Sequence, residues 1–221
     1  MTKFILVRHG LSTANNTGIF CGQYNAPLAE EGFSQAEDVA KYVCENYKID
    51  AIYSSDLSRV VDTITPTAEL LNLEIIKTKE LREINVGNWQ GKSLAQIEKE
   101  DPETFAPYQA CDTSVKLGGA ESFDDAAGRA LNFLKQLAKD NPDKTILIGS
   151  HGGVIRTLCA KWTGTSFYDM RVKYPITNAS ITEVVFDGDK QTVISCGYDK
   201  FLSSPSKDAD VNYFKGIGKP E

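Results

Sequence analysis

The chain contains two histidines, and each lies just beyond a short run of apolar residues and directly before a glycine. Residues 4–7 lie before Arg8 and His9, and residues 145–149 lie before Ser150 and His151. Apolar runs of this length are typical of buried strands. Because ligands of open α/β sheets bind at the carboxyl ends of the strands, both imidazoles are expected to reach one crevice.

Two arginines and one glutamate share this position at the end of a predicted strand. Arg8 directly precedes the first histidine. Arg59 follows a strand predicted at residues 51–53, and Glu83 follows one predicted at 74–77. Taken alone, each of these residues is more often structural or solvated than catalytic. Their common placement makes a shared site the better interpretation.

The chemistry that suits these side chains is transfer of a phosphoryl group. Arginine side chains form paired hydrogen bonds to phosphate and stay charged at any working pH. A neutral imidazole is a competent nucleophile near neutral pH when its second ring nitrogen is held by a hydrogen bond. We therefore predict that His9 attacks phosphorus and that His151 donates to the phosphate. Glycines at positions 10, 22, 152 and 153 allow backbone amides to approach the anion closely.

Strands and amphipathic helices alternate along the chain, which predicts an α/β fold with a mostly parallel sheet. Strands are expected at residues 3–7, 51–53, 74–77 and 145–149. Helices are expected at residues 30–47, 57–71, 123–137 and 154–162. Pro66 is expected to kink or weaken the second helix, and Ser122 with Asp125 is a capping signal for the third. A hairpin of residues 180–186 and 192–196 is expected to close one edge of the sheet.

The length of 221 residues fits one large domain, which we expect to span residues 1–199. Residues 101–121 are polar and contain two prolines and two adjacent glycines, so a lid or irregular insertion is expected there. Residues 200–221 are rich in Ser, Lys, Asp and Gly. They are expected to form a loosely held tail.

Composition and charge narrow the class of partner. The formal net charge is −6, and the absence of any block of Lys or Arg argues against nucleic acid or an anionic membrane as the main partner. The apolar run at residues 4–7 is too short for a signal peptide or a membrane span, so the expected location is the cytoplasm. The five cysteines are scattered and are interpreted as reduced thiols. The expected partner is a small phosphorylated metabolite, and the oligomeric state stays open.

Several short segments carry recognisable motifs. In chain order they are Leu6-Val7-Arg8-His9-Gly10 with Ser12 and Asn15, Tyr53-Ser54-Ser55-Asp56-Leu57-Ser58-Arg59, Leu81-Arg82-Glu83-Ile84, Ser150-His151-Gly152-Gly153-Val154-Ile155-Arg156, and Asn178-Ala179-Ser180-Ile181-Thr182. As a set they resemble the histidine phosphatase superfamily, in the branch that includes cofactor-dependent phosphoglycerate mutase. The resemblance runs from residue 4 to residue 182 and so covers most of the chain.

This resemblance implies a phosphoglycerate mutase-like fold, a three-layer sandwich with a mostly parallel central sheet flanked by helices. It implies that His9 is the phosphorylated nucleophile and that Glu83 protonates the leaving group and then activates water. It also implies that the phosphoryl oxygens are held by Arg8, Arg59, His151 and Asn15. The expected substrate-binding positions are Ser12, Asn15, Cys21, Gly22 and Gly152. The predicted net reaction is hydrolysis of phosphomonoesters, with no metal and no cofactor.

Three alternatives stay open. A phosphoglycerate mutase must hold a second phosphate, and members of that branch typically have Trp where this chain has Ala14 and a basic run after the glutamate equivalent to Glu83. Residues 101–125 contain six acids and only one lysine, an unpromising surface for that phosphate. A zinc hydrolase is disfavoured because the two histidines lie far apart and form no HxH or HExxH pattern. An inactive phospho-ligand binding module is disfavoured because it has no use for a proton donor at Glu83.

Overall fold

A six-stranded sheet forms the centre of the computed structural model, which describes residues 1–204 apart from the side chain of Asn16. The strand order is β3-β2-β4-β1-β5-β6. Strands β1 to β4 pair in parallel, whereas β5 and β6 pair antiparallel and form the predicted hairpin at one edge. The strands are β1 Thr2–Arg8, β2 Ala51–Ser55, β3 Ile75–Thr78, β4 Thr145–Ser150, β5 Ile181–Asp187 and β6 Lys190–Tyr198.

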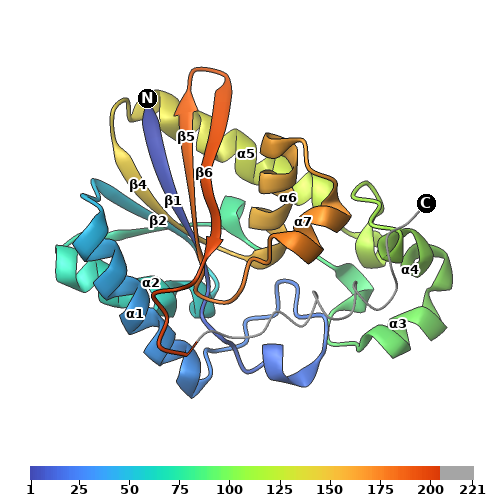
Figure 1. The fold of residues 1–221 in the computed structure, drawn as a ribbon. Coiled ribbons are helices and arrows are strands. Elements are labelled where there is room, and N and C mark those ends of the chain that lie inside the picture. Colours follow the sequence, from blue (N-terminus) through green and yellow to red (C-terminus); the bar gives the residue numbers. More distant parts are fainter. Residues whose placement is uncertain (205–221) are drawn as a thin grey trace.

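Helices cover both faces of this sheet, which confirms the predicted three-layer α/β sandwich. In Figure 1, α1 and α2 lie on one face and α5 and α6 on the other. The helices are α1 Glu30–Asn46, α2 Ser58–Leu71, α3 Leu94–Glu100, α4 Pro102–Gln109, α5 Phe123–Asp140, α6 Gly152–Thr163 and α7 Phe167–Lys173. None of the described helices has the length and apolarity that a membrane crossing requires.

Strand β1 shows why both faces need a helical layer. Its side chains alternate between the faces, as in any strand. Phe4 and Leu6 belong to the apolar core beneath α5 and α6, whereas Ile5 and Val7 belong to the core beneath α1 and α2. All four side chains are at most 1% exposed. The strand is therefore buried on both sides, and its carboxyl end is held firmly in place.

The longer helices follow the sequence prediction closely. Helix α5 begins after Ser122, and the reciprocal hydrogen bonds between Ser122 and Asp125 form the expected capping box. Pro66 does not interrupt α2, which continues as α-helix to Leu71. Ile64 and Ala68, on either side of the proline, are packed in the core beneath this helix, and that packing compensates for the lost backbone hydrogen bond.

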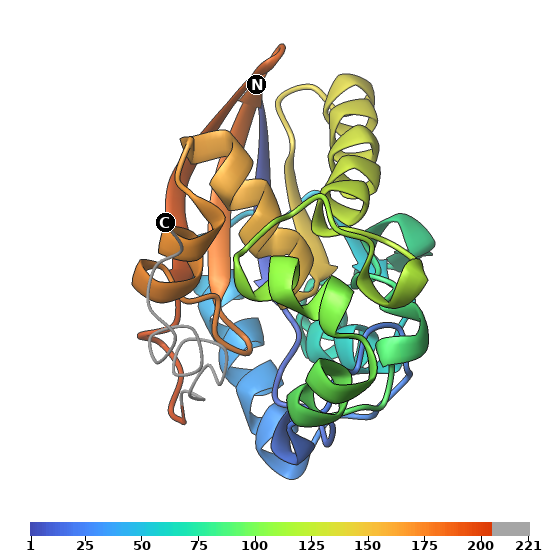
Figure 2. The ribbon, with the colours of Figure 1, turned by 90° about the vertical axis from the view of Figure 1, so that its right-hand side faces the viewer.

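Residues 101–121 are more regular than the sequence suggested. Helix α4 begins with Asp101 as its N-cap and Pro102 in its first turn. Phe105, Tyr108 and Leu117 are buried in the main core. In both views the segment with α3 and α4 lies toward the end of the sheet where the parallel strands finish (Figures 1 and 2). The irregular structure expected here is wrong for α4, and a lid function stays a prediction.

The start of the expected tail is packed against α1. Leu202 is 7% exposed and belongs to the core beneath α1 and α2. The ring of Phe201 stacks on Tyr42 with centroids 4.4 Å apart, and the Ser203 hydroxyl donates to Asp38 at 2.7 Å. The prediction of a loosely held tail is therefore wrong for residues 200–204. Its remaining part, residues 205–221, lies outside the described residues.

Candidate active site

The register of the central strands brings the two histidines together. Strands β1 and β4 pair in parallel with Arg8 opposite Ser150. The residues that follow Arg8 and Ser150, namely His9 and His151, therefore leave their strands at the same end of the sheet. Their ring centroids lie 5.2 Å apart.

Arg59 and Glu83 reach the same place from the neighbouring strands. Strand β2 pairs with β4 on its other side, and Arg59 lies in the first turn of α2, which follows β2. Strand β3 pairs with β2, and a short 3₁₀ helix, Lys79–Leu81, leads from it to Glu83. A cavity of about 550 Å³ opens at the carboxyl ends of these strands. Of the predicted site residues, those that line it are Arg8, His9, Ser12, Asn15, Cys21, Gly22, Arg59, Glu83 and Gly152.

The imidazole of His9 is held as a neutral ring with one nitrogen available. Its Nδ1 lies 2.7 Å from the carbonyl oxygen of Gly10. A carbonyl can only accept, so Nδ1 carries the proton and Nε2 keeps its lone pair. Burial, followed by the charges of Arg59 and Arg8, holds the pKa of His9 well below its ordinary value of 6.5. The ring therefore stays neutral at pH 7 and can act as a nucleophile.

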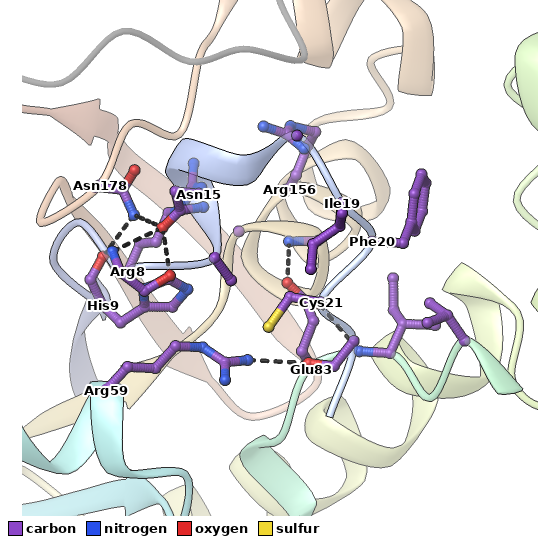
Figure 3. Close-up of a pocket in the computed structure, with 18 of the residues that line it drawn as sticks. Arg8, His9, Asn15, Ile19, Phe20, Cys21, Arg59, Glu83, Arg156 and Asn178 are labelled. Carbon is purple, nitrogen blue, oxygen red and sulfur yellow. Dashed lines mark hydrogen bonds between the residues drawn. The ribbon is translucent and has the colours of Figure 1, made fainter. Parts of the chain in front are cut away.

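Asn178 fixes the loop that carries His9. Its side-chain nitrogen lies within donating distance of the carbonyl oxygens of His9 at 3.1 Å and Gly10 at 3.2 Å, and of Asn15 Oδ1 at 3.3 Å (Figure 3). The backbone N–H of His9 donates to Ser150 at 3.1 Å. Asn178 belongs to one of the sequence motifs, but no role in the site was predicted for it. The structure makes it the residue that ties the hairpin side of the sheet to the first histidine.

Asn15 and Ser12 form a second support for the same loop. The backbone N–H and the hydroxyl of Ser12 donate to Asn15 Oδ1 at 2.9 and 2.8 Å. With its oxygen accepting these bonds, the NH₂ group of Asn15 is the part of the amide that can donate to an anion. Ser12 is 1% exposed, so its hydroxyl acts mainly in orienting Asn15.

Arg59 is held rigidly by the loop that contains Cys21 and Gly22. Its Nη1 donates to the carbonyl of Tyr24 at 2.7 Å, and Nη2 donates to that of Gly22 at 3.0 Å. Gly22 has φ +50°, and a Cβ there would lie 2.6 Å from Val86 Cγ2. Only glycine fits this close approach without strain. Burial raises the pKa of the neighbouring Cys21 thiol, which therefore lines the cavity as a neutral group.

His151 lies beside His9 and contacts Arg59 and Ser55. It is fully buried and is absent from the cavity lining. Its Nδ1 lies 3.2 Å from Arg59 Nη2, which is always a donor, so the imidazole Nε2 carries the proton and donates to Ser55 Oγ at 2.9 Å. Burial, followed by the charge of Arg59, lowers the pKa of His151 well below 6.5. In this arrangement the second histidine is a neutral support for an arginine.

Arg8 and Gly152 also line the cavity. Nη1 of Arg8 donates to the carbonyl oxygen of Ile176. A Cβ on Gly152 would lie 3.0 Å from Arg8 Nε, so the glycine leaves room for the guanidinium to pass α6. The predicted role of Gly152 was to let its backbone approach the anion. Here it also sets where the first arginine lies.

The carboxylate of Glu83 is oriented by two backbone amides. Ile84 N–H donates to Oε1 and Gly153 N–H donates to Oε2, both at 3.1 Å. Gly153 lies in the first turn of α6, whose positive end faces the site. Figure 3 shows the Glu83 carboxylate directed toward the interior of the cavity near Cys21. Among residues 1–204, no group of three or more His, Cys, Asp or Glu side chains is arranged to hold a metal ion.

The cavity is also lined by two arginines that were not predicted from the sequence to belong to the site. Arg156 on α6 and Arg171 on α7 are each 2% exposed. The sequence could have placed Arg156 at the site. It lies three positions after Gly153 and four after Gly152, so it shares their face of the helix. Arg171 had no such signal, since α7 itself was not predicted.

Comparison with known proteins supports one family throughout. The model of the histidine phosphatase superfamily, branch 1, matches residues 4–199. The chain is 32% identical over 206 residues to a metal-independent phosphoserine phosphatase of Arabidopsis thaliana, covering 92% of this chain and 84% of that protein. Among solved structures, it resembles YhfR of Bacillus stearothermophilus with a TM-score of 0.84 and 28% identity, covering 92% and 100% of the two chains.

A second solved structure adds a bound ligand to this comparison. It is a phosphoserine phosphatase from Entamoeba histolytica in complex with 3-phosphoglyceric acid. The TM-score is 0.79 at 26% identity, covering 91% of this chain and 100% of that one. The matched family model extends over nearly all of the described chain, from the first strand to the last. This chain therefore belongs to the histidine phosphatase superfamily, branch 1.

Proposed function

We propose that this enzyme hydrolyses phosphomonoesters of small metabolites through a phosphohistidine intermediate on His9. The observation that supports this most directly is the state of His9. A neutral imidazole with Nδ1 bound to Gly10 presents Nε2 in a cavity that Arg8 and Arg59 also line. These are the requirements for nucleophilic attack on a phosphate whose charge is held by arginines.

In the first step, the lone pair of His9 Nε2 forms a bond to phosphorus. The bond between phosphorus and the leaving oxygen breaks, and the protonated carboxyl group of Glu83 gives its proton to that oxygen. Arg8 and Arg59 stabilise the charge on the equatorial oxygens, and the NH₂ group of Asn15 adds a donor. The products are an alcohol and phosphohistidine, with Glu83 left as the carboxylate.

In the second step, water attacks the phosphorus of phosphohistidine. The Glu83 carboxylate takes a proton from the water, and the bond between phosphorus and Nε2 breaks with its electrons returning to the imidazole. Inorganic phosphate leaves, and Glu83 is protonated again. We assign His151 to positioning: its neutral ring holds Arg59 at 3.2 Å while adding no charge of its own.

A mutase reaction is the alternative within the family, and the structure strengthens its case in one respect. One of the reasons for disfavouring a mutase was the lack of cations for a second phosphate in residues 101–125. Arg156 and Arg171 supply such cations from α6 and α7. Hydrolysis remains our proposal because two of the three relatives described above, from Arabidopsis thaliana and Entamoeba histolytica, are phosphatases by name. With 3-phosphoglycerate and its bisphosphate primer, we expect release of inorganic phosphate in excess of any 2-phosphoglycerate.

Trapping of the intermediate tests the proposal. The enzyme is mixed with a phosphomonoester carrying radioactive phosphorus, quenched in alkali during turnover, and digested for peptide mapping. We expect an acid-labile phosphate on the peptide that contains His9. His9→Ala should lower turnover by about 10⁴-fold or more and abolish labelling. His151→Gln serves as the matched control and should still be labelled at His9. A label on His151, or turnover that persists in His9→Ala, contradicts the proposal.

A further inference from the structure

The peptide unit between Gly10 and Leu11 carries the hydrogen bond that keeps His9 reactive. Its carbonyl oxygen, on Gly10, lies 2.7 Å from His9 Nδ1 and accepts from it. Its N–H, on Leu11, donates to Oε1 of Gln35 at 2.8 Å. A trans peptide unit is planar and its two polar groups point in opposite directions, so a rotation that moves one group moves the other. The bond to Leu11 N–H therefore also aims the oxygen that fixes the tautomer of His9.

Gln35 is a polar residue on α1 that is 0% exposed. Both ends of its side-chain amide have partners, because Oε1 accepts from Leu11 and Nε2 donates to the carbonyl oxygen of Ser204 at 2.9 Å. Burial of an amide is costly unless its polar atoms are paired. The bond to Ser204 also decides which end of the amide is which. A carbonyl can only accept, so Nε2 is turned toward Ser204 and Oε1 toward Leu11.

Residues 201–204, called the strap below, lie along α1 and end at Gln35 (Figure 1). The backbone N–H and the hydroxyl of Ser203 donate to the carboxylate of Asp38 at 2.8 and 2.7 Å. The hydroxyl of Ser204 donates to Glu31 Oε1 at 2.8 Å. These bonds to α1 hold the carbonyl group of Ser204 where the amide of Gln35 can reach it.

We propose that Gln35 is a positioning residue that links the strap to the peptide unit after His9, and so keeps Nδ1 of His9 protonated and Nε2 free to attack. The link joins parts of the chain that are far apart, since Ser204 stands 169 positions after Gln35. An imidazole protonated at Nε2 has no lone pair there to offer to phosphorus. The inference rests on the proposed function for its effect on rate, whereas its effect on the ring does not depend on that function.

The tautomer of His9 can be measured directly, because the chain has only two histidines. With histidine labelled with nitrogen-15, NMR separates protonated from unprotonated ring nitrogens, and His9→Gln assigns the signals. The native protein should show His9 protonated at Nδ1 and His151 at Nε2. Gln35→Met keeps a similar volume and removes both hydrogen bonds, so part of the His9 population should become protonated at Nε2. The signals of His151 should not change, which makes this ring an internal control.

The same change should slow the chemistry more than it weakens binding. In Gln35→Met, phosphorylation of His9 by p-nitrophenyl phosphate should slow about tenfold or more, with KM changed by less than about threefold. Val39→Ala is the matched control, because Val39 is 0% exposed and lies about one turn further along the same face of α1. It removes packing from this helix and leaves both bonds of Gln35 in place. The tautomer and the phosphorylation rate should stay as in the native protein.

Leu202→Ala tests the strap. Leu202 is 7% exposed and belongs to the core beneath α1 and α2, so its truncation loosens the strap without changing Gln35. The tautomer and the rate should shift in the same direction as in Gln35→Met, the rate by about threefold. In the double variant Leu202→Ala should add nothing, because the strap acts through Gln35. If Gln35→Met does not fold, Leu202→Ala decides the matter.

The outcomes separate this inference from the function on which it rests. An unchanged His9 tautomer in Gln35→Met overturns the inference, and so does an equal loss of rate in Val39→Ala. Independent, additive losses in Leu202→Ala and Gln35→Met overturn the role of the strap. If phosphohistidine forms at the same rate in the native protein and in Gln35→Met, the inference fails alone. If the native protein forms no phosphohistidine, the proposed function fails, and the tautomer still decides the role of Gln35.

Discussion

Glu83 and Gly153 are joined by a hydrogen bond of 3.1 Å, from the backbone N–H of Gly153 to Glu83 Oε2. A Cβ at position 153 would lie 2.6 Å from Glu83 Oε1, closer than a real side chain allows. The first turn of α6 therefore orients the proposed acid, and a side chain at position 153 would force the Glu83 carboxylate to shift. The contact makes the position of Glu83 depend on a residue that takes no part in the chemistry.

Gly153→Ala should displace the Glu83 carboxylate while leaving the nucleophile in place. A misplacement of about 1 Å can cost on the order of 10²-fold in rate, so hydrolysis of alkyl phosphates should fall by 10- to 100-fold. Gly128→Ala on α5 is the control, because a Cβ there meets nothing within 4 Å. That change should leave kcat unaltered and raise stability by about 0.5–1 kcal/mol. Wild-type kinetics in Gly153→Ala would show that the carboxylate can move without penalty.

Because His9 and His151 are buried as neutral rings, the free energy of unfolding should depend on pH. Both have a folded-state pKa well below the ordinary 6.5, with burial as the largest cause. Above pH 6.5 both are neutral in either state, and their contribution to stability is fully present. As the pH falls below 6.5, the unfolded chain takes up protons that the folded protein excludes. The free energy of unfolding should therefore fall by about 1.4 kcal/mol per pH unit for each histidine.

Urea unfolding between pH 7.5 and about 5.5 measures this slope, because most carboxylates titrate below this window. His9→Gln and His151→Gln should each remove about half of it. The comparison uses the slope, so a change in overall stability caused by either substitution does not affect it. A slope that is the same in both variants and in the native protein would mean that neither histidine is kept neutral by folding.

The strand-end rule predicted much of the site from the sequence. His9, Arg59 and Glu83 line one cavity because the parallel strands end on the same side of the sheet. The register of β1 with β4 sets the two histidines side by side. The rule could not show that His151 is fully buried and holds Arg59. That arrangement depends on hydrogen bonds to Ser55 and Arg59 that no spacing reveals.

Element prediction succeeded for the strands and the long helices and missed the short helices. The strand expected at residues 145–149 is Thr145–Ser150, and the helix expected at 30–47 is Glu30–Asn46. Helices α3, α4 and α7 have only seven or eight residues, too few for a helical period to stand out. Local signals did exist for two of them, in the capping box of Ser93 and in Pro102 at the start of α4.

The position of Arg171 shows a deeper limit. Its guanidinium lies against the ring of Phe167 on its own helix, α7, and against the rings of Tyr108 on α4 and Phe123 on α5, which come much earlier in the chain. Two of those helices were not predicted, so no pattern along the chain could place this charge at the cavity. Periodicity reports which face of an element is apolar. It does not report which elements share a cavity, and the position of Arg171 at the cavity wall depends on that information.

Removal of metal ions should leave the enzyme active. In the proposed mechanism, guanidinium groups stabilise the charge on the phosphoryl oxygens, so no bound cation is required. Activity is expected to survive dialysis against EDTA, and vanadate should inhibit because it adopts the five-coordinate geometry of the transition state. Loss of activity after dialysis that zinc or magnesium restores would replace this mechanism with a metal-dependent one.

The role of Glu83 leads to a prediction that depends on the leaving group. An alkoxide is strongly basic and needs a proton as it departs, whereas p-nitrophenolate can leave without one. Glu83→Gln should therefore slow phosphorylation of His9 by an alkyl phosphate on the order of 10²–10⁴-fold and leave phosphorylation by p-nitrophenyl phosphate nearly unchanged.

The second step is slowed in Glu83→Gln for both esters, because the attacking water has lost its base. With p-nitrophenyl phosphate the variant should thus show a burst of phenolate, equal in amount to the enzyme, followed by a slow steady state. Rapid-quench measurement of phosphohistidine separates the two steps for each ester. Glu80→Gln and Glu121→Gln, which change the other acids near this segment, are measured in parallel as controls. Should phosphorylation slow equally for alkyl and aryl esters, Glu83 is not the proton donor, and whichever parallel variant shows the burst takes its place.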